Sequence, residues 1–281
     1  MKQQHILALR TASALCAIPA VLALLWFGGW VLFLGACGFL ALAVHEYTHM
    51  ARCKDVRPLW LAGFLASAAL SAAALWPSFR PWVSLGLVGS LAGGFAWRGI
   101  RVRRNATADL VATLVFVLYV GGAFACMLSI RGFGAPHVGL HPLQLGLPTG
   151  MWWMLVMLCG TWAFDTGAYL VGRKLGRHKM APVISPKKSW EGVAGGLVAA
   201  IPSVILATRP LGMTYGIAAA TAVAIAGAAI LGDLAESAFK RWAGVKDSGR
   251  FLPGHGGLFD RIDSVMLVAF VVFAARLLLA R

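Results

Sequence analysis

One stretch near the end of the chain, Ser237 to Asp263, combines residue types that bind phosphate with residue types that bind divalent metal. Its cations, aspartates and glycines include Lys240, Arg241, Lys246, Arg250, Arg261, Asp247, Asp260, Asp263, Gly249, Gly254, Gly256 and Gly257. Lysine and arginine bind phosphate oxygens, and glycine lets a ligand approach the backbone closely. Carboxylates suit Mg²⁺, and a metal is needed between a carboxylate and a polyphosphate because the two would otherwise repel each other. The stretch therefore predicts a site for a metal–polyphosphate complex.

The spacing of the aspartates supports this interpretation. Asp260 and Asp263 are three residues apart, so a helix would place both on one face, near an N-terminus that favours anions. Asp233 stands at the end of the preceding apolar segment. We expect the two helix ends to bring the three carboxylates together. The alternative is a solvated loop with ordinary surface ion pairs.

A second polar block, ISPKKSWEG at residues 184–192, places Lys187 and Lys188 after a Ser-Pro turn and before a helix start. Upstream, Asp165 lies about fifteen residues into an apolar segment. An ionisable residue in such a segment is a functional candidate, because unpaired charge is costly there. The alternative for Asp165 is a structural ion pair with a nearby lysine or arginine.

The string HEYTH, from His45 to His49, matches the helical H-E-x-x-H pattern of zinc proteases, in which the glutamate acts as base. Intramembrane metalloproteases resemble one another in also having a Leu-Asp-Gly motif. Here the nearest string is 231–233, Leu-Gly-Asp, in the wrong order. We keep an intramembrane zinc metalloprotease as a lesser alternative.

The composition requires that these residues be positioned by membrane helices. Of the 281 residues, 59% are hydrophobic and only 12% are charged, whereas soluble domains carry roughly 25% charged residues. We predict an all-α, polytopic integral membrane protein with about nine transmembrane helices, the first of them a retained helix rather than a signal peptide. The apolar segments are about 6–27, 29–48, 59–76, 82–97, 107–130, 150–171, 191–208, 211–231 and 263–280.

The charges predict an orientation. With a cytoplasmic N-terminus, twenty of the 25 lysines and arginines fall in cytoplasmic stretches, and the C-terminus is external. This bias explains most of the net charge of +15 without nucleic acid. Seven of the ten acidic residues follow residue 160. We therefore predict a transmembrane scaffold at 1–149 and a catalytic region at 150–281, with cytoplasmic loops 172–190 and 232–262.

The residues quoted above resemble the phosphatidate cytidylyltransferase family, also called CDP-diacylglycerol synthases. Ser237 through Asp263 matches the family pattern with unbroken spacing, and the blocks ISPKKSWEG and FDTGAYLVGRKLG are similar to further family blocks. The resemblance implies that CTP and phosphatidic acid give CDP-diacylglycerol and pyrophosphate at the cytoplasmic face of a bacterial inner membrane. A related CTP-dependent lipid kinase is an alternative, and a transporter would spread its charges through the midplane.

The resemblance also implies roles for individual residues. Mg²⁺, with the option of a second metal ion, is expected on Asp233, Asp260 and Asp263, which with Lys246 and His255 form the predicted catalytic set. The predicted substrate-binding residues are Asp165, Ser185, Lys187, Lys188, Lys240, Arg241 and Arg261. The expected partners are CTP, phosphatidic acid and membrane lipid, with a homodimer as an option and no nucleic acid.

Overall fold

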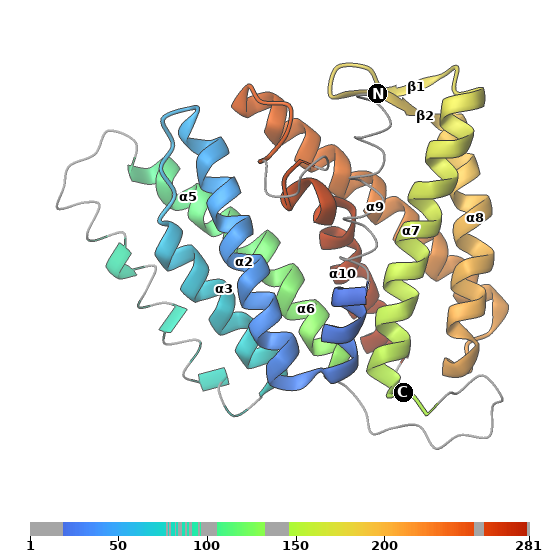
Figure 1. Cartoon of the computed structure of the whole chain (residues 1–281), viewed down its shortest axis with the longest axis horizontal. Helices are drawn as coiled ribbons and strands as arrows, with labels where there is room; N and C mark the ends of the chain where they lie inside the picture. The colour runs from blue at the N-terminus through green and yellow to red at the C-terminus, as the bar shows by residue number, and fades with distance from the viewer. Residues whose placement is uncertain are drawn as a thin grey trace. The chain divides into compact units, whose positions relative to one another are not determined.

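The computed structural model describes residues 19–76, 106–132, 146–249 and 256–279, with scattered positions between 78 and 96. Residues 19–27 are helical, and a two-stranded antiparallel hairpin interrupts the helices that follow. The elements are α2 (Gly29–Arg52), α3 (Trp60–Leu75), α5 (Ala106–Phe116), the π-helix η2 (Val117–Gly121), α6 (Gly122–Arg131), α7 (Thr149–Leu175), β1 (Lys179–Ala181), β2 (Ser185–Ser189), α8 (Trp190–Thr208), the 3₁₀-helix η3 (Arg209–Leu211), α9 (Tyr215–Ala243) and α10 (Phe259–Leu279) (Figure 1).

The prediction of a helical, multi-pass membrane protein is confirmed. Among the described residues, six helical stretches are long and apolar enough to cross a bilayer. They are Gly29–Arg52, Ala106–Arg131, Thr149–Leu175, Trp190–Leu211, Tyr215–Ala243 and Phe259–Leu279. The predicted count of nine is not confirmed. Trp60–Leu75 has only 16 residues, and the predicted segments 6–27 and 82–97 lie partly outside the described residues.

The chain divides into two compact units. Unit 1 comprises Met1–Leu128 with Lys240–Ile262, and unit 2 comprises Ser129–Phe239 with Asp263–Arg281. The division passes through α9 and α10, so each of these helices contributes to both units. The predicted scaffold and catalytic halves stay a prediction.

Unit 1 is built on α2, α3 and the α5–η2–α6 stretch. Its core includes Leu40, Met50, Phe116 and Val120, each at most 1% exposed. Polar side chains connect its helices: the Tyr47 hydroxyl donates to the carbonyl of Ala112 at 2.9 Å. Such bonds suit a membrane protein, because polar groups away from water must find partners inside the fold.

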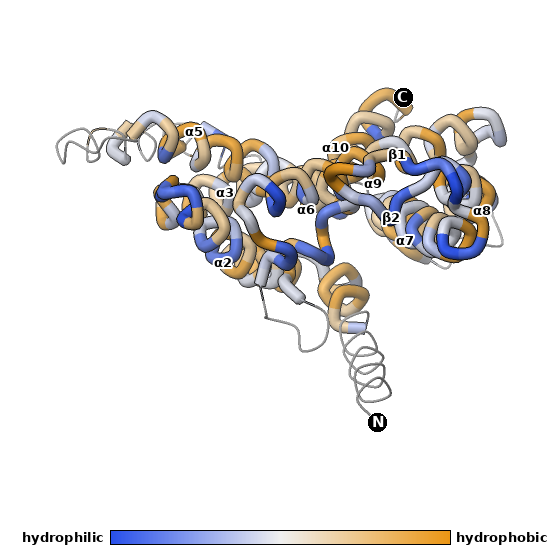
Figure 2. The backbone as a smooth tube through the Cα atoms, turned by 90° about the horizontal axis from the view of Figure 1, so that it is seen from above, coloured by the Kyte–Doolittle hydropathy of each residue, from blue (hydrophilic) through white to orange (hydrophobic). Residues whose placement is uncertain are grey.

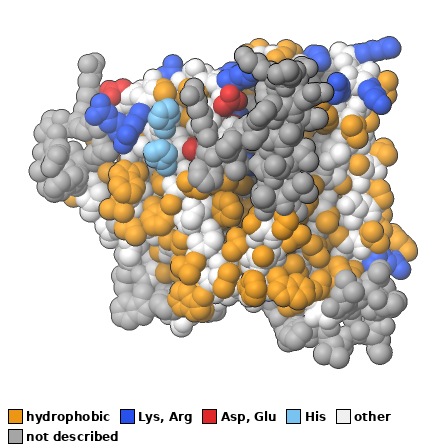
Figure 3. All heavy atoms as spheres, in the orientation of Figure 1, with side chains coloured by type: hydrophobic (Ala, Val, Ile, Leu, Met, Phe, Trp, Pro, Cys, Tyr) orange, Lys and Arg blue, Asp and Glu red, His pale blue; other side chains and the backbone are white. Residues whose placement is uncertain are grey.

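In unit 2, α7 and α8 lie side by side and the β1–β2 hairpin connects them (Figure 1). Small residues let the two helices approach closely. A Cβ on Gly167 would lie 2.6 Å from the carbonyl oxygen of Gly195 and 2.8 Å from the Cβ of Ala199. Close approach of this kind is typical of helix packing in bilayers. Hydrophilic residues gather at the hairpin end of this pair (Figure 2), and hydrophobic side chains are abundant on the face drawn in Figure 3.

Candidate active site

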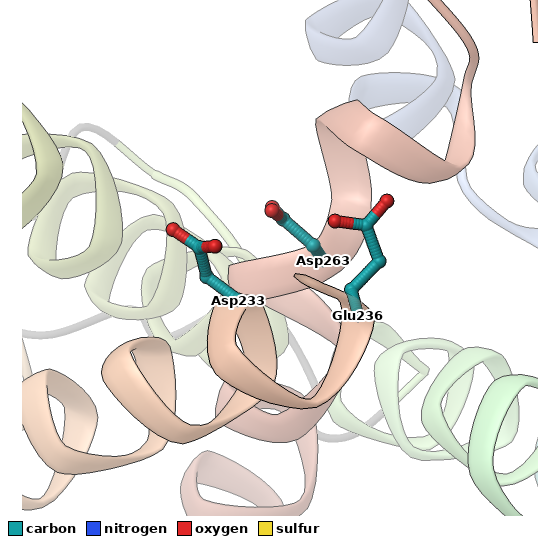
Figure 4. A group of neighbouring side chains, drawn as sticks. All are labelled: Asp233, Glu236 and Asp263. Carbon is teal, nitrogen blue, oxygen red and sulfur yellow. The ribbon is translucent and has the colours of Figure 1, made fainter. Parts of the chain in front are cut away.

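Three carboxylates meet where α9 and α10 come together in unit 2 (Figure 4). One oxygen each of Asp233, Glu236 and Asp263 lies within 4.8 Å of the other two. Asp233 and Asp263 are partly buried, and Glu236 is 2% exposed. Asp233 and Glu236 are three residues apart on α9 and therefore share a face of that helix. Convergent carboxylate oxygens of this kind can hold a divalent cation.

A glycine permits the approach of these two helices. A Cβ added to Gly232 would lie 2.5 Å from the carbonyl oxygen of Asp263. Any side chain at this position would have to push α9 and α10 apart. The sequence thus places a glycine directly before Asp233, at the point where its carboxylate must reach the neighbouring helix.

Strand β2 brings a cation to the carboxylate group. The Nζ of Lys188 lies 2.7 Å from Oδ2 of Asp233, and the Ser237 hydroxyl donates to Oδ1 of Asp233 at 3.2 Å. Lys187, the neighbouring residue, is exposed, since successive strand residues point to opposite faces. The structure therefore brings one of the two predicted lysines to the carboxylates.

The start of α8 fixes the strand that carries Lys188. Ser189 is the N-cap of α8, and its hydroxyl accepts a hydrogen bond from the backbone N–H of Gly192 at 3.2 Å. Glu191 accepts hydrogen bonds from the backbone N–H groups of Arg177 and His178, both at 3.1 Å. These bonds satisfy backbone groups that a helix start and a hairpin end would otherwise leave open.

Asp165, on α7, belongs to the same neighbourhood. The Ser264 side chain hydrogen-bonds its carboxylate, and Asp233, Asp263 and Lys188 lie within electrostatic range of it. Asp165 and the three-carboxylate group thus place four acidic residues in this part of unit 2. The sequence identified three of these acids; Glu236 was missed, although its three-residue spacing from Asp233 was a usable signal.

Asp260 has different partners, in unit 1. One carboxylate oxygen lies 2.6 Å from Nζ of Lys240, and the other accepts hydrogen bonds from the backbone N–H groups of Ser248 at 3.0 Å and Gly257 at 2.9 Å. Both Asp260 and Lys240 are nearly buried, with side chains 9% and 12% exposed. The structure therefore pairs a predicted metal ligand with a predicted phosphate contact, and Asp260 is not a member of the three-carboxylate group.

The remaining predicted residues are placed as follows. Arg241, Lys246 and Arg261 are exposed, and Arg241 donates to the carbonyl of Val245 at 3.2 Å. Ser185 begins β2 and is partly buried. His255 lies outside the described residues. The roles assigned to these residues stay predictions.

The HEYTH string has a structural use. Glu46 is 5% exposed, and its two oxygens accept hydrogen bonds from the Ser248 hydroxyl and from the backbone N–H groups of Leu258 and Phe259, each at 2.9 Å. His45 and His49 are exposed on α2. Donors already occupy the carboxylate that a protease would use as base, so the geometry gives the metalloprotease alternative no support.

Fold and site together define a polytopic helical membrane protein with an acidic, lysine-containing site suited to a cation and phosphate groups. The comparisons with known proteins make this specific. The cytidylyltransferase family model matches residues 8–279. The chain therefore belongs to the cytidylyltransferase family, which confirms the resemblance stated from the sequence.

Curated relatives agree over almost the whole chain. A phosphatidate cytidylyltransferase of Staphylococcus haemolyticus is 35% identical over 265 residues, covering 92% of this chain and 95% of the relative. Phosphatidate cytidylyltransferases of Staphylococcus epidermidis and Staphylococcus aureus are 34% and 35% identical with the same coverage. These comparisons give the lipid-kinase and protease alternatives no support.

Proposed function

We propose that this chain transfers the cytidylyl group of CTP to phosphatidic acid, giving CDP-diacylglycerol and pyrophosphate. The observation that carries the proposal is the group of Asp233, Glu236 and Asp263 with Lys188 beside it, in a chain of the cytidylyltransferase family. A lipid phosphate oxygen attacks the α-phosphorus of CTP. The bond from that phosphorus to the bridging oxygen of the β-phosphate breaks, and pyrophosphate leaves.

The nucleophile needs little activation, since a phosphate oxygen is already ionised near neutral pH. The main obstacle is the repulsion between an anionic lipid headgroup and a more anionic triphosphate. Catalysis of such transfers rests mostly on positioning and electrostatic stabilisation. Lys188 supplies a cation held in place by Asp233, and Lys187 presents a second cation on the exposed side of the same strand.

The residues present fit a divalent cation. Asp233, Glu236 and Asp263 offer hard oxygen ligands within 4.8 Å of one another, and Lys188 contacts one of them, Asp233. We assign Mg²⁺ to this group, so that Glu236 takes the place that sequence spacing gave to Asp260. When bound, Mg²⁺ neutralises phosphate charge. A second metal ion, a homodimer and the absence of nucleic-acid binding stay predictions.

The lipid substrate and the apolar helices place the reaction at a membrane. We assign the site to the cytoplasmic side of a bacterial inner membrane, on the strength of the charge bias in the sequence. Thr214 and Asp247 are exposed and flank α9. In a cysteine-free background, Thr214→Cys should react with an impermeant maleimide added outside intact cells, and Asp247→Cys should react only after lysis. Labelling of both from one side would contradict this orientation.

The reaction is tested with purified protein, phosphatidic acid, Mg²⁺ and CTP labelled at either the α- or the γ-phosphate. Cytidylyl transfer puts the α-label into a lipid product and the γ-label into pyrophosphate, as resolved by lipid chromatography. A kinase would instead put the γ-label into lipid when diacylglycerol is supplied. Absence of α-labelled lipid with the folded protein would overturn the proposed function.

A matched pair of variants connects the activity to the site. Asp233→Asn removes one carboxylate of the group, whereas Asp55→Asn removes an exposed carboxylate in the turn after α2. Asp55 has a φ of 55°, a conformation that asparagine tolerates well. We expect Asp233→Asn to lower turnover at least about a hundredfold and Asp55→Asn to leave it within about twofold.

A further inference from the structure

We infer that Glu46 is a positioning residue for the nucleotidyl-transfer site, because it anchors the first turn of α10, the helix that carries Arg261 and Asp263. The inference rests on the proposed function. Glu46 lies on α2, more than 200 residues away in sequence from its partners in the α9–α10 turn and at the start of α10. The H-E-x-x-H pattern therefore contains a residue that serves the transferase, although not as a metal-site base.

Both carboxylate oxygens of Glu46 accept hydrogen bonds. Oε1 accepts a hydrogen bond from the backbone N–H of Leu258, and Oε2 accepts hydrogen bonds from the backbone N–H of Phe259 and the Ser248 hydroxyl. The first N–H groups of a helix have no partner within the helix, and the helix N-terminus favours negative charge. A buried carboxylate suits both requirements, because it is an acceptor and an anion.

Asp260 binds the same turn. It accepts hydrogen bonds from the N–H groups of Ser248 and Gly257 and forms an ion pair with Lys240, the residue that begins the unit 1 part of α9. Glu46 and Asp260 thus both bind described residues of the α9–α10 connection. Glu46 binds Ser248, Leu258 and Phe259, and Asp260 binds Ser248 and Gly257. The end of α9 is fixed separately. Gly244, at a φ of 77°, donates its backbone N–H to the carbonyl of Arg241, and the N–H of Val245 donates to the carbonyl of Lys240.

Two glycines show how closely the backbone approaches the Glu46 carboxylate. A Cβ on Gly249 would lie 2.5 Å from Oε1 of Glu46, and a Cβ on Gly257 would lie 2.5 Å from Oε2. Neither position accepts a side chain without displacing Glu46 or the turn. The glycines that suggested a ligand cradle in the sequence therefore include two that make room for a carboxylate of the protein itself.

Helix α10 connects the backbone that Glu46 holds to residues of the proposed site. Phe259 is the first residue of the helix, Arg261 lies two residues later and Asp263 four residues later. A change at the anchored turn shifts the axis and the start of this helix, and displacements of about 1 Å at a reacting centre cost about a hundredfold in rate. Glu46 acts on the reaction through α10 and is not assigned contact with substrate.

The test uses Glu46→Gln, which keeps the size of the side chain. One of its two terminal atoms becomes a donor, so one of the N–H groups of Leu258 and Phe259 loses its acceptor. We expect kcat/KM for CTP per folded protein to fall at least about tenfold. We also expect amide hydrogen exchange, followed by mass spectrometry, to accelerate in peptides that cover the turn and the start of α10.

Asp109→Asn is the matched control. Asp109 is also a fully buried carboxylate of unit 1, and it accepts a hydrogen bond from the backbone N–H of Arg57 at 2.6 Å, in a different turn. We expect this variant to accelerate exchange near residue 57 and to keep kcat/KM within about twofold at matched folded concentration. Equal losses of kcat/KM in Glu46→Gln and Asp109→Asn would overturn the positioning role, as would wild-type kinetics in Glu46→Gln.

Two further variants keep the inference testable if Glu46→Gln does not fold. Ser248→Ala removes one of the three hydrogen bonds, and Gly257→Ala displaces the turn while leaving the carboxylate intact. Both should lower kcat/KM for CTP and accelerate exchange at the start of α10, and unchanged kinetics in both would refute the role. Inactive wild-type protein would instead refute the proposed function, and the exchange measurements would still report on the anchor.

Discussion

Replacing Asp263 by asparagine tests the candidate site most directly. The substitution keeps the side-chain size and removes one negative charge from the group it forms with Asp233 and Glu236. The asparagine amide also places a donor where a cation would need an acceptor. We expect turnover to fall at least about a hundredfold, which corresponds to about 2.7 kcal/mol in the activation barrier.

The same geometry predicts the opposite sign for stability. Two full charges at the 4.8 Å limit repel by about 3.5 kcal/mol at an effective dielectric constant of 20, and solvent screening at partly exposed groups lowers this value. Removing one of three neighbouring carboxylates relieves part of this repulsion. The melting temperature of metal-free Asp263→Asn protein should therefore equal or exceed that of the wild type.

The assay measures cytidylyl transfer against Mg²⁺ concentration, and gel filtration in detergent shows that the variant is folded. A weakened metal site requires more Mg²⁺ and regains part of its activity at high concentration, whereas a purely structural defect gains nothing. Near-normal turnover in Asp263→Asn, or wild-type turnover that survives EDTA, would refute the assignment of a catalytic metal to these carboxylates.

Three further predictions concern the charges around the site. Lys188→Met should lower turnover at least about tenfold without loss of folding, since it removes the cation next to the carboxylates; turnover per folded protein checks this. Asp260→Asn should lower the free energy of unfolding by about 3 kcal/mol, because it removes the carboxylate charge that lies 2.6 Å from the nearly buried Lys240 cation, and adding Lys240→Met should recover part of this loss in denaturant titrations. His45→Ala and His49→Ala should each keep turnover within about twofold, because both side chains are exposed on α2; zinc in the purified protein together with loss of turnover in both would revive the protease hypothesis.

Sequence patterns predicted a helical membrane protein because the signal for this class, a long apolar run, is local and recurs along the chain. Apolar runs long enough to cross a bilayer need no knowledge of distant contacts, and six helices among the described residues fit that criterion. The count was harder to predict, since an apolar run of 16 residues such as Trp60–Leu75 falls short of a full span.

Position along the chain also predicted that Asp233 and Asp263 carry the chemistry. Each lies at the end of an apolar segment, where an unpaired charge is energetically costly and therefore indicates a function. It did not predict their third partner. Asp260 and Glu236 each stand three residues from one of these aspartates, and helical periodicity treats the two arrangements alike. Tertiary structure decided between them, because Asp260 meets Lys240 and two backbone donors while Glu236 faces Asp233 and Asp263.

The role of Glu46 could not be predicted from the sequence. Its five-residue string matched a metal-site pattern, and nothing nearby in the chain indicated otherwise. Its partners are Ser248, Leu258 and Phe259, so only the packing of α2 against the start of α10 shows what the carboxylate does. The sequence by itself determined a helical membrane cytidylyltransferase, since that class follows from local apolar runs and a contiguous motif. Tertiary structure alone decided which carboxylates gather in one group and which hold the backbone, because a carboxylate's role depends on the donors it meets after folding.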